Sequence, residues 1–89
     1  MPEKGCVVLA TAGREKGRLF VVLQCSEARC LIADGRTRRL RHPKRKNPRH
    51  LQPTGRRLDP EQYAADGRLR RALAEAEHRD DDTNPERGR

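Results

Sequence analysis

Residues 5–23 read GCVVLATAGREKGRLFVVL, which places two short apolar runs on either side of a charged turn. Each run is five residues long and partly β-branched, and this favours a buried strand over a helix. We therefore expect strands at residues 5–10 and 18–23. Between them, Gly13 and Gly17 permit positive φ angles, so the turn can be tight while its charged side chains project outward.

A third strand is expected at the next apolar run, Cys30-Leu31-Ile32-Ala33. Asp34-Gly35 follows this run directly, and it is the strongest short-range hairpin signal in the chain. The sequence therefore predicts a fourth strand over residues 36–41.

Two prolines, Pro43 and Pro48, bracket Lys44-Arg45-Lys46-Asn47 and predict an exposed loop there rather than a helix or a central strand. Residues 50–52 form the last candidate strand, which Pro53 ends. Five short strands joined by turns, with no long connection, predict a mostly β fold: a small SH3-like barrel, closed or nearly closed. Closure would remove the exposed edges that a flat sheet carries.

The pattern beyond residue 58 is helical. Asp59 can cap a brief first helix that has Pro60 at its first position, and Asp66-Gly67 interrupts this helix. Spacing of i, i+3, i+4 and i+7 then predicts a second amphipathic segment, whose apolar stripe consists of Leu69, Ala72, Leu73 and Ala76. This stripe needs a partner, and the strand module is the expected one.

The chain of 89 residues allows one small domain at most. Leu, Ile, Val and Phe supply only 15 of these residues, but ten of the 15 lie within the first 35 positions, so a compact core is expected there. Residues 80–89 hold no apolar side chain to bury and are predicted to be disordered. The expected organisation is therefore a strand module over residues 1–58, a helical extension over residues 59–79 and a disordered tail.

Charge is divided unevenly along the chain, whose formal net charge is +8. Residues 1–58 hold 15 basic and 4 acidic side chains, whereas residues 59–89 hold 6 and 9. Residues 36–57 contain ten basic and no acidic residues, a block that repels itself unless an anion lies nearby. This excess is larger than solubility requires. Because guanidinium and ammonium groups neutralise phosphates, we expect contact with nucleic acid.

Several pieces of the sequence, taken in order, resemble a KOW motif. They are Gly5-x-Val7-Val8-Leu9-Ala10, then Ala12-Gly13-Arg14-x-Lys16-Gly17-Arg18 with the run Leu19 to Leu23, then Leu31-Ile32-Ala33-Asp34-Gly35-x-x-Arg38 followed by Leu40 and the basic loop up to His50-Leu51. Over roughly residues 4–77 the chain looks like the small bacterial KOW-domain RNA-binding proteins that are similar to archaeal and eukaryotic large-subunit ribosomal protein fourteen. The resemblance implies an SH3-like barrel that binds RNA, ribosomal RNA or the ribosome in particular, without catalytic activity.

The candidate RNA-binding residues are the basic side chains of the first turn and of the following basic block: Arg14, Lys16, Arg18, Arg36, Arg38, Arg39, Arg41, Lys44, Arg45, Lys46 and Arg49. Gly13, Gly17 and Gly35 would allow close approach of an RNA backbone, with turn geometry alone as the alternative reading. Phe20 and Tyr63 are the only aromatic residues, so base stacking cannot be the main mode of contact. We expect contacts to phosphates and to the shape of structured RNA, mainly through the basic loop.

Other classes of function fit less well. Cys25, Cys30, His42 and His50 could supply four zinc ligands, but the spacing of the two histidines is too wide for a finger. No pairing of nucleophile and base suggests an enzyme, and we expect no catalytic residues, no metal and no cofactor. The main alternative is a protein-interaction module that docks on a ribosomal, assembly or transcription factor, for which an exposed Leu69/Leu73 stripe would be the signature. A DNA-binding barrel is a third possibility.

The longest apolar runs are far shorter than the ~20 residues that span a bilayer, and no signal core follows the start of the sequence. We therefore expect a cytoplasmic protein without membrane contact, monomeric when free. Cys6, Cys25 and Cys30 cannot all pair within one chain, and a reducing compartment would leave them as thiols. No disulfide framework is expected.

Overall fold

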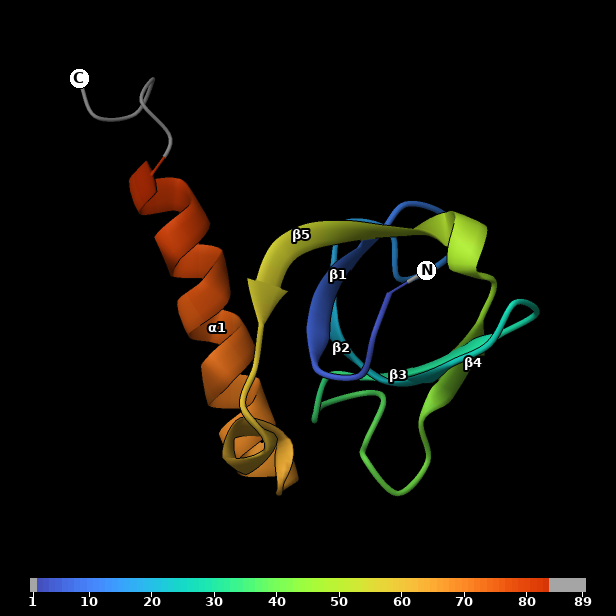
Figure 1. Ribbon diagram of the computed structural model, residues 1–89. Helices are drawn as coiled ribbons and strands as arrows, with labels where there is room; N and C mark the ends of the chain where they lie inside the picture. Colours follow the sequence, from blue (N-terminus) through green and yellow to red (C-terminus); the bar gives the residue numbers. More distant parts are fainter. Residues whose placement is uncertain (1, 84–89) are drawn as a thin grey trace.

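The computed structural model describes residues 2–83, which form a curled sheet with one long helix beside it (Figure 1). The strands are β1 (Cys6–Ala10), β2 (Leu19–Cys25), β3 (Cys30–Ala33), β4 (Lys44–Lys46) and β5 (Leu51–Arg57). Two single 3-10 turns, η1 (Pro48–His50) and η2 (Pro60–Tyr63), precede β5 and the helix α1 (Asp66–Thr83). The predicted mostly β class with a C-terminal helical extension is confirmed.

The five strands form one antiparallel sheet in the order β4-β3-β2-β1-β5. Pairing within residues 2–83 does not run round a full circle, because β4 and β5 are the two edges of the sheet. Strong curvature nevertheless brings these edges round toward each other, and η1 connects them directly (Figure 1).

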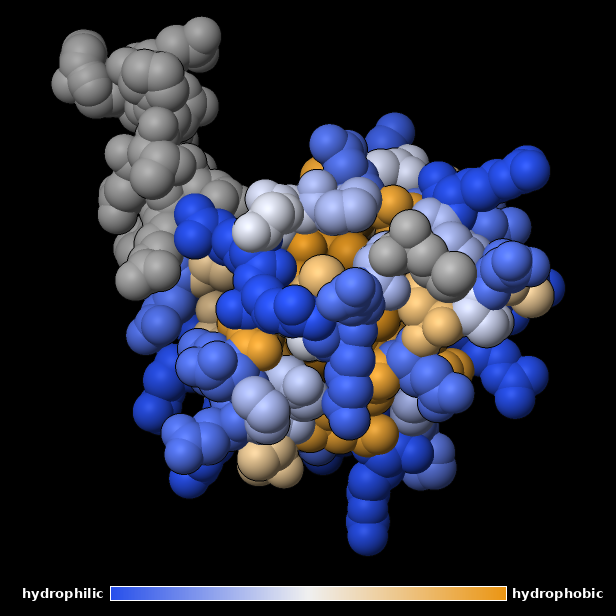
Figure 2. Space-filling view, viewed as in Figure 1, coloured by the Kyte–Doolittle hydropathy of each residue, from blue (hydrophilic) through white to orange (hydrophobic). Residues whose placement is uncertain are grey.

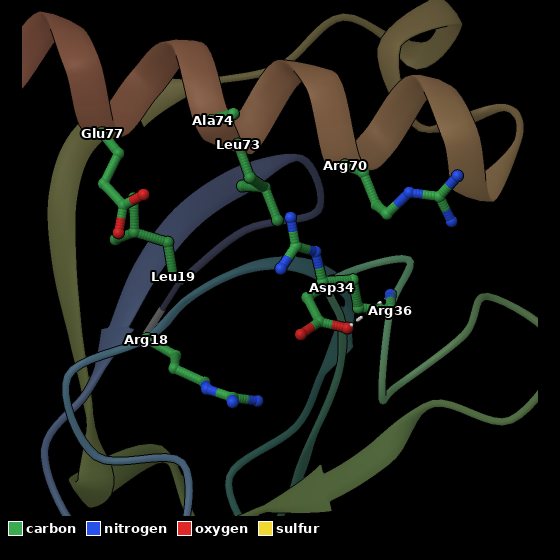
Figure 3. A pocket seen from close by; sticks show the side chains of 8 residues that line it. All are labelled: Arg18, Leu19, Asp34, Arg36, Arg70, Leu73, Ala74 and Glu77. Atoms are coloured by element: carbon green, nitrogen blue, oxygen red, sulfur yellow. Dashed lines mark hydrogen bonds between the residues drawn. The ribbon is translucent and has the colours of Figure 1, made fainter.

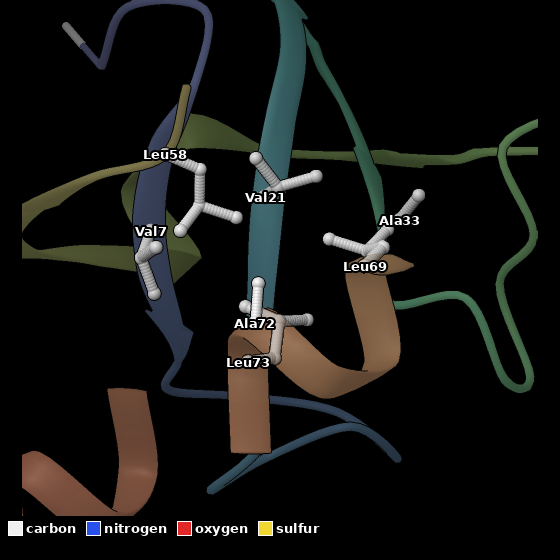
Figure 4. Packing of buried hydrophobic residues seen from close by; sticks show 7 residues of the cluster. All are labelled: Val7, Val21, Ala33, Leu58, Leu69, Ala72 and Leu73. Carbon is white, nitrogen blue, oxygen red and sulfur yellow. The ribbon is translucent and has the colours of Figure 1, made fainter. Parts of the chain in front are cut away.

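Both faces of the sheet are apolar, which explains why the first two strands are continuous apolar runs rather than alternating ones. Val7, Val21 and Ala33 lie in register across three neighbouring strands. Together with Leu58 they pack against Leu69, Ala72 and Leu73 of α1 and form the outer cluster (Figure 4). The opposite face carries the inner cluster, which consists of Val8, Ala10, Phe20, Val22, Cys30, Ile32 and Leu51.

The predicted amphipathic stripe is the buried face of α1. Leu69 is fully buried, and Ala72, Leu73 and Ala76 are 5–7% exposed. The helix therefore covers the outer cluster and completes the core of the strand module. Within residues 2–83, no helix combines the length and the apolar character that crossing a bilayer requires.

Gly35 permits the close approach of α1. It is buried with φ +78°, and a Cβ atom at this position would collide with the backbone carbonyl oxygen of Asp66. Two hydrogen bonds fasten the same contact: Arg70 Nη1 donates to the Gly35 carbonyl, and the Leu40 amide donates to Asp66 Oδ1, both at 2.9 Å. Gly35 was predicted to allow close approach of an RNA backbone; in the structure, the segment that approaches it is the first turn of the helix.

The predicted fourth strand over residues 36–41 is wrong. The Asp34 carboxylate accepts hydrogen bonds from the backbone amides of Arg36 and Arg38 at 2.9 Å and from the Thr37 hydroxyl at 3.2 Å. The Arg38 carbonyl in turn accepts from the amides of Asp34 and Gly35. These bonds hold the segment as a loop, and β3 pairs instead with a strand further along the chain.

The loop predicted between Pro43 and Pro48 is also wrong, because Lys44–Lys46 is strand β4. It pairs with β3 through Lys44 opposite Ile32 and Lys46 opposite Cys30. Its edge position agrees with the prediction that this segment is not a central strand.

The last strand is longer than the predicted residues 50–52, since β5 continues through Pro53 to Arg57. An edge strand tolerates proline because one side of it needs no partner. The register with β1 shifts between Cys6 and Val8, and at this irregularity the Thr54 hydroxyl donates to the Val7 carbonyl at 2.8 Å.

Two further expectations need correction. Residues 80–83, predicted to be disordered, belong to α1, while the rest of the predicted tail, residues 84–89, lies outside the described residues. Cys25 and Cys30 were expected as thiols but are joined by a disulfide, and Cys6 is the free cysteine among residues 2–83. The two cysteines are opposite each other in the register of β2 and β3, which places their Cα atoms 4.0 Å apart.

Candidate nucleic-acid interface

A buried carboxylate, Glu15, lies at the centre of the basic region. Its side chain is 7% exposed and meets three cations. Arg38 Nη2 lies 2.9 Å from Glu15 Oε2, Lys46 Nζ lies 3.5 Å from Oε1, and Lys44 Nζ lies 3.7 Å from Oε2. One acid from the β1–β2 loop thereby joins the loop after β3 to strand β4.

The cations keep Glu15 ionised despite its burial. The hydrogen bond from Arg38, assisted by the charges of Lys44 and Lys46, lowers the pKa of Glu15 from 4.5 to about 2, although burial alone would raise it. One negative charge cannot balance three positive ones, so the group retains an excess of two positive charges. We call these four side chains, Glu15, Arg38, Lys44 and Lys46, the Glu15 cluster.

Lys46 is an internal member of this cluster rather than a surface residue. It is 8% exposed, and its Nζ also donates to the Ala12 carbonyl at 2.9 Å. A Cβ atom at Gly13, where φ is +84°, would lie 2.9 Å from Lys46 Nζ. Gly13 therefore leaves room for a lysine of the same chain, and the expectation that Lys46 projects from an exposed loop is wrong.

The other predicted contact residues are accessible. Arg38 and Lys44 are partly buried, and the exposed ones are Arg14, Lys16, Arg18, Arg36, Arg39, Arg41, Arg45 and Arg49. We call these ten residues the basic surface. Figure 2 shows hydrophilic side chains projecting from the module in the view of Figure 1.

Hydrogen bonds bring the segments that carry the basic surface together. Arg18 Nη1 donates to the Thr37 hydroxyl at 3.3 Å, which ties the start of β2 to the loop after β3. The Thr11 amide donates to the His50 carbonyl at 2.8 Å, which ties the β1–β2 loop to η1. Gly17 lies in the same loop with φ +88°, and no atom lies within 4 Å of the position of its missing Cβ. Of the three predicted glycines, Gly17 alone leaves open space.

A cleft of about 190 Å³ lies beside the contact between α1 and the sheet (Figure 3). Arg70, Leu73 and Glu77 project into it from the helix, opposite residues that include Arg18, Asp34 and Arg36 (Figure 3). Its volume is below the ~300 Å³ at which ligand pockets usually begin. Its lining contains two acids, Asp34 and Glu77, as well as three arginines, so the cleft does not form a uniformly positive site.

Neither aromatic residue has a fully exposed ring. Phe20 is fully buried in the inner cluster, and Tyr63 packs against the outer cluster. In the part of the chain that the structure describes, no three His, Cys, Asp or Glu side chains come together in a group that could hold a metal. The two cysteines of the zinc alternative are bonded to each other.

Sequence reasoning missed Glu15, because a single acid in a charged, glycine-flanked turn looks like a solvated residue. The available signal was local composition, since Glu15 is the one acid among Arg14, Lys16 and Arg18. Its partners lie 23 to 31 residues away, and nothing in the sequence marks such a pairing.

Comparison with known proteins identifies relatives among curated proteins. No family model matches the sequence. Two curated relatives from Methanococcus maripaludis, of strains C6 and S2, are each 31% identical to this chain over 71 residues. Both are named large ribosomal subunit protein eL14, and the aligned region covers 80% of this chain and 87% of each relative.

Proposed function

Because the chain belongs to the family of large ribosomal subunit protein eL14, we propose that it is a non-catalytic, ribosome-associated protein that binds structured ribosomal RNA. The basic surface makes the contact, chiefly to phosphates. The protein acts in the cytoplasm as a monomer until it binds its RNA.

The observation that carries this proposal is the convergence of three basic segments. The β1–β2 loop, the loop after β3 and β4 meet at the Glu15 cluster, although they are far apart in sequence. Folding therefore brings cations from distant parts of the sequence together. A concentrated positive surface is typical of proteins that bind nucleic acid.

Phosphate contact is the mode that the available side chains support. Phe20 is fully buried and Tyr63 is partly buried against the outer cluster, so neither residue presents a fully exposed ring on which bases could stack. Eight of the ten residues of the basic surface are arginines, and their planar forks suit phosphate oxygens. Such contacts position an RNA without reading its sequence, so we expect weak sequence selectivity.

For the fold we propose an SH3-like barrel of the KOW type that is nearly closed. Support comes from the strong curvature of the five strands, from the inner cluster on one face and from η1, which links the two edge strands. Because the barrel is not fully closed, β4 and β5 remain edge strands. The short length of β4 and the proline in β5 both discourage pairing of these edges with another chain.

At Leu69 and Leu73, the structure does not show the exposed apolar stripe that the protein-interaction alternative predicts. That alternative required an exposed Leu69/Leu73 stripe, whereas these two residues are 0% and 7% exposed on the face of α1 that packs against the sheet. The DNA-binding alternative is distinguished from RNA binding by a competition experiment, in which duplex DNA and ribosomal RNA of similar length compete for the protein.

Crosslinking in cells followed by sequencing of the attached RNA tests the proposal. We expect reads concentrated on large-subunit ribosomal RNA, and competition in vitro that favours this RNA over duplex DNA. Crosslinks that are absent, or that fall on messenger RNA or DNA alone, would contradict the proposal.

A further inference from the structure

The Glu15 cluster has an inner half and an outer half. Glu15 and Lys46 are closed off from solvent, with side chains 7% and 9% exposed. Arg38 and Lys44 contact the same carboxylate, but 35% and 32% of their side chains remain exposed. The outer pair thus faces the carboxylate on one side and solvent on the other.

We propose that Arg38 and Lys44, held in place by Glu15, form a clamp for a single RNA phosphate group. The inference rests on the proposed RNA-binding function and assigns part of it to two residues and the acid that positions them. Arg38 and Lys44 contact the phosphate, and Glu15 is a positioning residue that does not.

The charge balance favours an anionic occupant. Three cations around one carboxylate leave an excess of two positive charges, and Glu15 is too deeply buried to be exchanged for an incoming anion. A phosphate diester carries one negative charge and two free oxygens, so it can reach both outer cations at once. Bringing it to this place lowers the repulsion between them.

Unused hydrogen-bond donors point the same way. Arg38 uses Nη2 for Glu15 and keeps 35% of its side chain exposed. Its Nε has no hydrogen-bond partner within the described residues, but it is buried and is not among the donors that a phosphate can reach. Lys44 Nζ forms a 3.7 Å ion pair with Glu15, and no hydrogen bond from this ammonium group is found in residues 2–83. Both side chains are therefore oriented by the acid and keep donors for a ligand, which reduces the ordering cost of binding.

Strand β4 provides a matched control. Lys44 and Lys46 are opposite Ile32 and Cys30, which belong to the inner cluster, so the two lysines share that face of the sheet. Arg45 lies between them opposite Leu31, on the other face, and is exposed. Lys44→Gln and Arg45→Gln therefore remove one charge each from neighbouring positions, and only the first removes it from the clamp.

The test measures binding of the full-length protein to a large-subunit ribosomal RNA fragment across a salt series. We expect K44Q to weaken binding roughly tenfold and to reduce the log–log salt slope by about 0.7 to 0.9, the value of one lost phosphate contact. R45Q should weaken binding about threefold or less. Equal losses in K44Q and R45Q, or a larger loss in R45Q, overturn the clamp.

Glu15→Gln provides a second, independent test, because the clamp and a diffuse basic surface predict opposite changes in RNA affinity. This change adds one unit of positive charge to the protein, so a diffuse basic surface would bind RNA more tightly. The clamp instead predicts weaker binding, because Arg38 and Lys44 lose the acid that orients them. Tighter or unchanged binding by folded E15Q overturns the positioning role, and if circular dichroism shows E15Q to be unfolded, the comparison of K44Q with R45Q decides alone.

The results that would overturn the clamp differ from the result that would overturn the proposed RNA-binding function. Wild-type protein that does not bind ribosomal RNA contradicts the function itself. Wild-type protein that binds, with K44Q no weaker than R45Q, contradicts only the clamp.

Discussion

Arg38 Nη2 donates a 2.9 Å hydrogen bond to the carboxylate of Glu15 and so joins two loops that lie 23 residues apart in the sequence. Glu15 is the shared partner of the loop after β3 and of strand β4, and the surface proposed to bind RNA is built around it. The stability of the fold and the shape of this surface therefore depend on one buried acid.

The ion pairs of Glu15 predict a specific loss of stability in acid. The pKa of Glu15 is lowered in the folded protein from 4.5 to about 2, so its contribution is fully present above pH 4.5 and disappears as the pH falls to about 2. A shift of this size corresponds to about 3 kcal/mol at neutral pH. Urea unfolding at several pH values should show the stability of the wild type converging on that of E15Q over this range. A constant difference between the two proteins would contradict the assignment.

Gly35→Ala should destabilise the protein more than Gly17→Ala. Both glycines have positive φ, so each substitution incurs the backbone strain of about 1–2 kcal/mol. A Cβ atom at Gly35 additionally meets the Asp66 carbonyl, while at Gly17 it meets nothing within 4 Å. Steric overlap of this kind adds about 1–3 kcal/mol. Chemical denaturation measures the difference, and equal losses would mean that α1 does not dock on the loop after β3.

Leu69→Ala should cost about 2–5 kcal/mol, since Leu69 is fully buried between α1 and the sheet. Arg71→Ala, at an exposed position on the same helix, should change stability by less than about 0.5 kcal/mol. The midpoints of urea unfolding report both values. A negligible effect of L69A would indicate that the helix stripe is free, as the protein-interaction alternative requires.

Lys46 should be separable from the contact residues beside it. Lys46→Gln leaves Glu15 with one fewer buried partner, so we expect it to lower stability by about 3 kcal/mol or more. The triple substitution of Lys44, Arg45 and Arg49 to Gln, which leaves Lys46 in place, should lower RNA affinity. It should also lower the midpoint of thermal unfolding by less than K46Q does. A larger thermal shift in the triple variant would contradict the division between internal and surface cations.

The apolar strands could be predicted from the sequence because their signal is local. Residues 5–10, 18–23 and 30–33 match β1, β2 and β3 closely, and the stripe at Leu69 and Leu73 correctly gave the buried face of α1. Strand β4 could not be predicted, because Lys-Arg-Lys has no apolar pattern and pairs through its backbone with β3.

The errors near Asp34 and Glu15 have a common physical origin. Asp34-Gly35 has the composition of a hairpin turn, but the Asp34 carboxylate caps the amides of its own loop instead. Glu15 and Lys46 are of residue types that usually lie on the surface, and contacts between residues 23 to 34 positions apart make their burial favourable. Long-range polar pairing of this kind leaves no periodic trace in a single sequence.

The salt dependence of ribosomal RNA binding tests the central claim most directly. Binding of the wild-type protein to a large-subunit ribosomal RNA fragment should weaken linearly in a log–log plot, with a slope of about −0.7 to −0.9 for each phosphate contacted. The triple variant of Lys44, Arg45 and Arg49 should show a slope that is shallower by about two to three such contacts. Contradiction would come from a folded wild-type protein whose binding is absent near 0.1 M salt, or from a triple variant that retains the wild-type slope.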